Sequence, residues 1–246
     1  MNSFSSQMEH HQFIREIVDK QVRPLVDKLH HDDSYSLSEL EEYSKALFKW
    51  TMAIRACFET LEHARAYLGH FRSYKWYKEA GIGRSHYINY HYYNYAITVV
   101  KIMDIALILT DRTFRLGNPA KLCRLENIVE NSWVRYRGID KSLKKLESIV
   151  KSWREPRNLF VHRGETRDSR LLNLLGAWDT IIMSGELVPS ILRSVTRRWY
   201  SKEVSEIFKE FEQTETPLFE ATSDLLSQLL PIYRFWHDIL KQIPNR

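Results

Sequence analysis

The chain has 246 residues and a formal net charge of +5, and 43% of its residues are hydrophobic, among them seven Trp. This composition can fill a core, which excludes an intrinsically disordered chain, and the mild positive excess suits an anionic partner without requiring one. Only eight Gly and seven Pro occur, and no segment alternates apolar with polar residues as a half-buried strand does, so we predict an all-α fold, a helical bundle.

Three features of the sequence predict the cellular compartment of the protein. Cys57 and Cys123 each lie within an apolar helical pattern, which favours reduced, buried thiols. The opening sequence MNSFSSQMEHH is too polar for a signal peptide. The most apolar segment, residues 96–109, contains Lys101 and Asp104 and is short for a membrane span. We therefore predict a cytoplasmic protein without membrane association.

The first two predicted helices form a scaffold. Residues 8–31 have apolar side chains at helical spacing, and Pro24 is expected to kink or divide this helix. In the second helix, Ser36 and Glu39 have the spacing of a capping box, and Gly69 is a natural C-terminal stop.

A basic and aromatic loop is predicted over residues 70–85, HFRSYKWYKEAGIGRS, and it precedes YINYHYYNY, which has five Tyr within nine residues. Basic residues interleaved with rings suit a single-stranded nucleic acid, with phosphates on the cations and bases on the rings. Tyrosines at helical spacing also commonly wedge between packed helices. Both interpretations are open from the sequence alone.

The predicted helix over residues 87–116 is the most hydrophobic one. Its polar side chains Asn94, Lys101 and Asp104 fall within about 80° of one another at 100° per residue. We expect this stripe to face water, a cleft or a partner.

Further helices complete the bundle. Asn118 with Pro119 is expected to begin the next helix, and Gly138 to end it. Helical patterns follow at residues 139–153, 166–183, 190–213 and 217–243, with a break near Pro217 and a kink near Pro231. A single domain over 1–246 is the simplest organisation, and a division near Gly185 is the alternative.

Residues 157–162, RNLFVH, place an arginine and a histidine on either side of an apolar patch. The same spacing occurs at Arg65 and His70, so the spacing alone is weak. An asparagine directly after the arginine is found only in the set Arg157, Asn158 and His162.

This motif, after an amphipathic helix, resembles the R-polar-x-x-x-H signature of the HEPN superfamily, helical domains of prokaryotic toxin and antiviral defence systems. The resemblance implies a HEPN-like core at about 87–183, with helical elaborations at 1–86 and 186–246. It also implies a metal-independent endoribonuclease that acts on RNA as a homodimer, and the possibility of a neutralising protein partner. By the family's pattern Arg157 and His162 are catalytic, and Asn158 supports their geometry.

Elementary chemistry agrees with that expectation. Cleaving RNA without a metal requires a base for the 2′-OH, an acid for the departing 5′ oxygen and a cation for the charge on phosphorus. Histidine and arginine supply these groups. A two-fold dimer would bring two copies of His162 to one cleft. We predict no cofactor and no metal, because neither the HHDD sequence at 30–33 nor the pair His63 and His70 forms a convergent ligand set.

Arginines around the motif suggest a positive rim, in which Arg154 and Arg163 are candidate RNA-binding residues together with Lys101, Asp104 and Asn94. Geometry poses a problem, since residues five apart on an ideal α-helix differ by about 140°. A loose first turn at Pro156 or fraying at Gly164 could turn Arg157 and His162 toward one pocket. The alternative function is a non-catalytic helical module that binds RNA or a protein.

Overall fold

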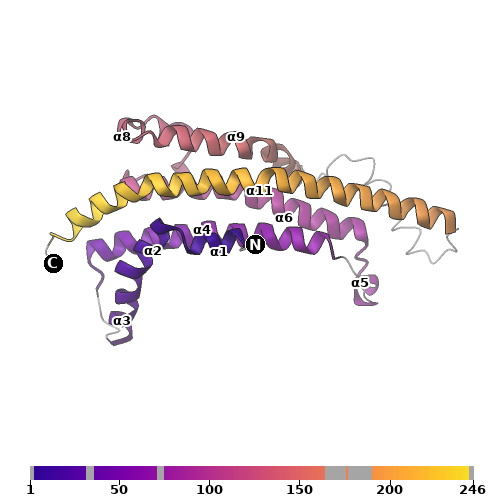
Figure 1. The fold of residues 1–246 in the computed structure, drawn as a ribbon, viewed down its shortest axis with the longest axis horizontal. Coiled ribbons are helices and arrows are strands. Elements are labelled where there is room, and N and C mark those ends of the chain that lie inside the picture. Colours follow the sequence, from indigo (N-terminus) through magenta and orange to yellow (C-terminus); the bar gives the residue numbers. More distant parts are fainter. Residues whose placement is uncertain (1–2, 32–35, 71–74, 164–175, 177–189, 244–246) are drawn as a thin grey trace. The chain divides into compact units, whose positions relative to one another are not determined.

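The computed structural model describes residues 3–31, 36–70, 75–163, 176 and 190–243 (Figure 1). Every regular element in these ranges is a helix, which confirms the all-α fold. The elements are α1 Phe4–Glu9, α2 Gln12–Ile17, the π-helix η1 Val18–Val22, α3 Arg23–His31, α4 Glu39–Leu68, α5 Lys75–Glu79, α6 Arg84–Phe114, the 3₁₀-helix η2 Ala120–Leu122, α7 Leu125–Val129, α8 Ser132–Tyr136, α9 Ile139–Asn158, the π-helix η3 Leu159–Arg163 and α11 Ser190–Leu240.

Contacts divide the chain into two compact units. Unit 1 consists of residues 1–59, 101–150 and 217–246, and unit 2 of residues 60–100 and 151–216. Four of the helices have one part in unit 1 and another part in unit 2, namely α4, α6, α9 and α11. The single domain with a core at 87–183 stays a prediction, because compact packing units do not by themselves define domains.

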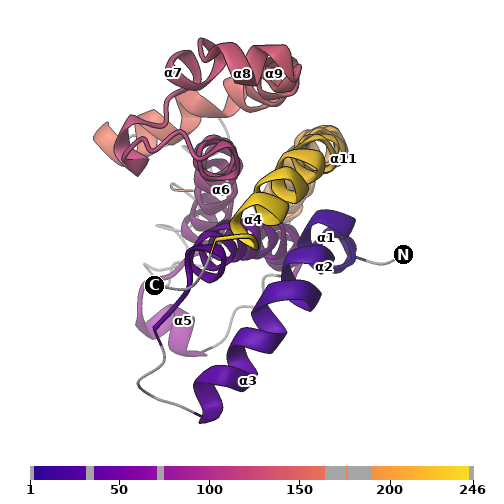
Figure 2. The same ribbon diagram turned by 90° about the vertical axis from the view of Figure 1, so that its left-hand side faces the viewer.

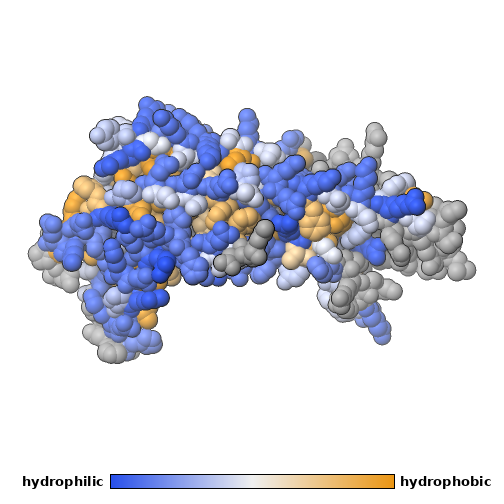
Figure 3. All heavy atoms as spheres, viewed as in Figure 1, coloured by the Kyte–Doolittle hydropathy of each residue, from blue (hydrophilic) through white to orange (hydrophobic). Residues whose placement is uncertain are grey.

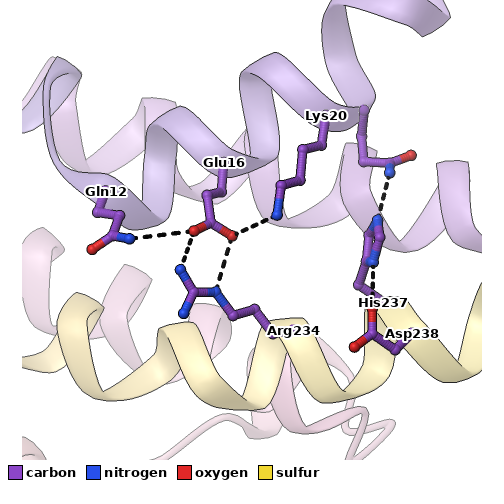
Figure 4. A network of polar contacts seen from close by, with 7 residues as sticks. Gln12, Glu16, Lys20, Arg234, His237 and Asp238 are labelled. Carbon is purple, nitrogen blue, oxygen red and sulfur yellow. Dashed lines mark hydrogen bonds and ion pairs between the residues drawn. The ribbon is translucent and has the colours of Figure 1, made fainter.

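In unit 1 the N-terminal helices pack on the C-terminal part of α11 (Figure 2). The ring of Phe13 lies 6.0 Å from that of Tyr233. At the edge of this contact Glu16 accepts hydrogen bonds from Arg234, Gln12 and Lys20 (Figure 4). A buried aromatic contact bordered by ion pairs therefore joins the two ends of the chain.

The N-terminal helical pattern is divided differently from the prediction. Helix α1 begins earlier, with Ser3 as its N-cap, and a turn at His10 separates it from α2. Pro24 lies in α3, directly after the π-helical turn η1. Proline has no N–H for the carbonyl of Lys20, and the π turn directly before it is wider than an α turn.

The capping box of α4 was assigned to the wrong serine. Ser38 and Glu41 form it: Glu41 N donates to Ser38 Oγ at 3.3 Å, and Ser38 N donates to Glu41 Oε2 at 2.8 Å. Both serines have a glutamate three residues later, so spacing could not choose between them. The stop at Gly69 is confirmed, because α4 ends at Leu68.

The single helix predicted between Asn118 and Gly138 is wrong. Three short helices, η2, α7 and α8, occupy this segment. Asn118 is not an N-cap, because its backbone N and its Nδ2 both donate to Asp111 Oδ1, at 3.3 and 2.7 Å. Gly138, with φ of 74°, ends the segment as predicted.

Helix α11 runs without a break through Pro217 and Pro231, so the predicted division near Pro217 is wrong. Buried side chains continue at helical spacing on both sides of the two prolines, including Phe211, Leu218, Leu225, Leu229 and Tyr233. Burial of this face offsets the local cost of each proline, which is about 3 kcal/mol. The helix predicted at 166–183 lies outside the described residues, apart from Gly176.

Helix α6 is long and apolar enough to cross a membrane by length and composition alone. However, 72% of its most apolar window is buried inside the structure, as is common for a core helix. Hydrophilic side chains cover most of the described surface in the view of Figure 3.

Candidate active site

The core of unit 2 fixes the end of α9. The Trp153 side chain is buried, and its Nε1 donates to Thr214 Oγ1 of α11 at 3.1 Å. Its ring lies 5.0 Å from that of Tyr95 on α6, and Tyr95 stacks on Phe211 at 3.5 Å. Helices α6, α9 and α11 therefore meet directly below the motif.

The tyrosine-rich segment contributes mainly to this core. Tyr92, Tyr93 and Tyr95 are buried, which confirms the packing interpretation for these three residues. Tyr92 donates its hydroxyl to Glu210, and Tyr95 donates to the carbonyl of Phe211. The rings of Tyr92 and Tyr95 thus pack inside while their hydroxyls have acceptors, as buried tyrosines require.

The motif RNLFVH crosses a change of helix type. Helix α9 ends at Asn158, and residues 159–163 form the π-helix η3. Phe160 stacks on Tyr93 with 4.2 Å between ring centroids and 8° between ring planes. Since Tyr93 is buried in the core, this stack holds the π turn against α6.

The π turn changes the geometric problem posed by the spacing of Arg157 and His162. A turn with i→i+5 hydrogen bonds is wider than an α turn, so it brings residues five apart closer to one face. The first predicted solution is wrong, because Pro156 lies in the last turn of α9 and not in the first turn of a helix. Gly164, the second, lies outside the described residues.

An open groove of about 590 Å³ runs along this face of α9 and η3. Asn158 and His162 both line it, and both side chains are exposed. Arg157 is not part of the lining, but its Nη1 donates to Asn158 Oδ1 at 2.8 Å. The predicted catalytic residues thus lie together. Asn158 lines the groove and also accepts the hydrogen bond from the guanidinium of Arg157.

The other predicted binding residues are distributed unevenly. Arg154 lines the groove. Asn94 is half-buried on the part of α6 in unit 2, whereas Lys101 and Asp104 are exposed on the part in unit 1, and none of the three belongs to the groove lining. The side chain of Arg163 lies outside the described residues.

Three lining residues were missed from the sequence, namely Lys151, Glu155 and Leu159. Lys151, Glu155, Asn158 and His162 follow one another at steps of four, three and four residues, which is the spacing of one helix face. Extending the face of His162 toward the N-terminus would have found them.

The groove combines the imidazole of His162 with the cations Lys151 and Arg154 and the carboxylate of Glu155. Such a set can bind an anion and move a proton. Among the residues with described positions, no three His, Cys, Asp or Glu side chains cluster as metal ligands would.

A comparison with protein-family models gives a match that covers the motif. The family model described as HEPN_Cthe2314-like HEPN matches residues 30–177, which is more than half of the chain and includes the whole motif. No curated protein and no solved structure matches. The chain belongs to the HEPN_Cthe2314-like HEPN family.

Proposed function

We propose that the chain is a metal-independent endoribonuclease of the HEPN type. The proposal depends on one observation: Asn158 and His162 face the same open groove, and Arg157 is hydrogen-bonded to Asn158. The family match and the cations in the groove support it.

In the proposed reaction the 2′-OH of RNA loses its proton to an imidazole and attacks the adjacent phosphorus. The bond from phosphorus to the 5′ oxygen then breaks, and this oxygen receives a proton. The products carry a 2′,3′-cyclic phosphate and a 5′-OH. His162 transfers the proton, while Arg157 and Arg154 stabilise the negative charge that develops on the phosphorane oxygens. Asn158 orients the guanidinium of Arg157 through the 2.8 Å hydrogen bond.

We further propose that the active form is a homodimer. Among the residues that the structure describes, all six that line the groove come from α9 and η3, and they include one histidine. Base and acid are needed on opposite sides of the phosphorus, and a two-fold related copy would supply a second His162 across the groove.

Incubation of the purified protein with RNA in EDTA tests the function. We expect cleavage that yields 2′,3′-cyclic phosphate ends, and a rate that is about 100-fold to 10,000-fold lower in His162→Ala. His10→Ala is a matched control, because His10 is also exposed but lies in unit 1. An unchanged rate in His162→Ala would refute the catalytic role. RNA binding without any turnover would favour a non-catalytic binding module instead.

A further inference from the structure

Unit 2 has a second hollow, apart from the groove of the motif. Its volume is about 390 Å³, and its described lining comes from the end of α4, the first residue of α6 and the part of α11 around residues 200–208. All of these residues belong to unit 2, and none of them lines the groove on α9 and η3. Small-molecule sites occupy roughly 300–1,000 Å³, so this hollow is large enough for a ligand. We call it the α4–α6–α11 pocket.

One side of the α4–α6–α11 pocket is apolar. Its residues are Leu68, the last residue of α4, and Val204 and Phe208 of α11. Gly69 allows the ring of Phe208 to lie against the end of α4, because a Cβ at residue 69 would be 3.3 Å from Phe208 Cζ. This side can therefore remove an apolar part of a ligand from water.

The pocket also contains a cation. Arg84 is the one charged side chain among the described residues that line it. The guanidinium is half-buried and lies over the ring of Tyr200, with 4.9 Å from Cζ to the ring centroid. Stacking on a ring restricts the orientation of the guanidinium, whose parallel N–H groups match the two oxygens of a carboxylate. Arg84 is therefore suited to bind the anionic end of a ligand.

Two serine hydroxyls in the pocket can bind the same ligand. Ser201 and Ser205 line the pocket one helical turn apart on α11. Farther along α11 the hydroxyls of Thr214, Thr222 and Ser227 donate to the carbonyl four residues earlier. Within the described part of the chain, Ser201 and Ser205 have no such acceptor, so both hydroxyls can donate to a ligand or to water.

The described lining favours a ligand with one negative charge. It contains no carboxylate that would repel an anion, and its single guanidinium balances one charge. A phosphate monoester or a nucleotide carries two or more charges, and a buried charge without a partner is costly. A few polar groups that fix a ligand's orientation beside an apolar wall are typical of small-molecule sites.

We infer that the α4–α6–α11 pocket binds a small organic carboxylate. The carboxylate lies at Arg84, and the apolar body of the ligand lies against Leu68, Val204 and Phe208. This site goes beyond the proposed nuclease function and does not depend on it.

Isothermal titration calorimetry of the full chain tests the site, with sodium octanoate as the probe. Sodium acetate keeps the carboxylate without the chain, and 1-octanol keeps the chain without the charge. We expect octanoate to bind, and each of these two partial ligands to bind about tenfold or more weakly. Inorganic phosphate and AMP represent other classes of anion, and we expect both to bind more weakly than octanoate.

Variants locate the site and identify the role of the charge. Arg84→Gln should weaken octanoate binding about tenfold or more and leave 1-octanol binding unchanged, because only the charge-assisted bonds are lost. Ser205→Trp fills the opening from an exposed position and should weaken the binding of both ligands. Arg198→Gln is a matched control, because Arg198 is an exposed arginine of α11 outside the described lining. It should bind octanoate as the wild type does.

The inference is overturned if octanoate does not bind to the wild type, or binds equally to the wild type and to Arg84→Gln or Ser205→Trp. Acetate that binds as tightly as octanoate would refute the role of the apolar side, and tighter binding of phosphate or AMP would refute the carboxylate class. If thermal unfolding shows that Arg84→Gln is less stable than the wild type, Arg84→Lys and Ser205→Trp decide. Lysine keeps the charge without the planar fork, so its octanoate affinity should lie between those of Arg84→Gln and the wild type. None of these results depends on RNA cleavage, which the assay in EDTA tests separately.

Discussion

Each unit ties another helix to α11 through a glutamate and an arginine, and the two pairs differ in how well the carboxylate is satisfied. In unit 1, Glu16 of α2 is 14% exposed and accepts bonds from Arg234 and Lys20. In unit 2, Glu215 of α11 is 3% exposed and accepts from Arg65 at 2.9 Å, while its Oε1 has no hydrogen-bond partner.

The two carboxylates therefore have pKa shifts of opposite sign. The hydrogen bond from Arg234 is the largest influence on Glu16 and lowers its pKa to about 2. Burial raises the pKa of Glu215, and this effect outweighs the nearby charge of Arg65. The number of donors and the remaining contact with water decide which influence is larger.

This contrast extends beyond the two pairs. Unit 1 satisfies its buried acids with several donors each: Glu41 accepts from Lys28 and from Ser38. In unit 2 the buried acid Glu215 is incompletely satisfied, and the motif belongs to the same unit. The buried acids of the two units therefore differ in how completely they are hydrogen-bonded.

Replacing Glu16 should have the larger effect on stability. A lowered folded-state pKa gives stabilisation that is present above the unfolded value of 4.5 and is lost as the pH falls toward 2. We expect Glu16→Gln to reduce the free energy of unfolding by about 2 kcal/mol at pH 7, and the difference from wild type to shrink below pH 4.

Urea unfolding from pH 2.5 to 8 measures this difference across most of the pH range in which the stabilisation is lost. Glu220→Gln is a suitable control, because Glu220 is an exposed glutamate of α11, the helix that carries Arg234. A difference for Glu16→Gln that stays constant down to the lowest pH would show that the ion pair does not lower the carboxyl pKa.

Replacing Glu215 should have a smaller effect with the opposite pH trend. A raised carboxyl pKa means that the wild type loses stability as the pH rises above the unfolded value of 4.5. Glu215→Gln removes this loss, and Arg65 keeps its 2.7 Å bond to Glu212. We expect a change within about 1 kcal/mol at pH 7, and a balance that shifts in favour of the variant as the pH rises above 4.5.

The same unfolding series tests this expectation, with Glu212→Gln as the control on the exposed partner of the same arginine. Destabilisation by several kcal/mol at pH 8 would contradict the comparison. It would mean that the charged Glu215 is held as firmly as Glu16.

The sequence predicted the features that depend on side-chain pattern. Helical spacing identified the all-α fold, and the motif identified Asn158 and His162, which share the groove. The π-helical form of residues 159–163 could not be predicted from the sequence. A turn with i→i+5 hydrogen bonds is defined by which carbonyl accepts from each N–H, and this leaves no periodic pattern of side chains. The continuity of α11 was not predicted, because Pro217 and Pro231 each indicate a local interruption of a helix. Burial of one face along the helix outweighs this local effect.

The sequence also did not show which tyrosine rings of α6 are exposed to solvent. Tyr90 and Tyr93 are the same residue type one helical turn apart, yet one is 67% exposed and the other is buried. Only the packing of α6 against its neighbours in unit 2 distinguishes them. The sequence therefore left the packing and nucleic-acid interpretations of this segment open, and burial confirms the packing interpretation for Tyr92, Tyr93 and Tyr95.

The most direct test of the central claim, that Arg157 and His162 act as one site, is a cycle of cleavage rates. The four proteins are wild type, Arg157→Ala, His162→Ala and the double variant, with the exposed Arg137→Ala as control. We predict that each single variant loses about 100-fold or more, and that the double variant is no slower than the slower single one. A wild-type rate for Arg157→Ala, or losses that multiply fully in the double variant, would contradict a shared site.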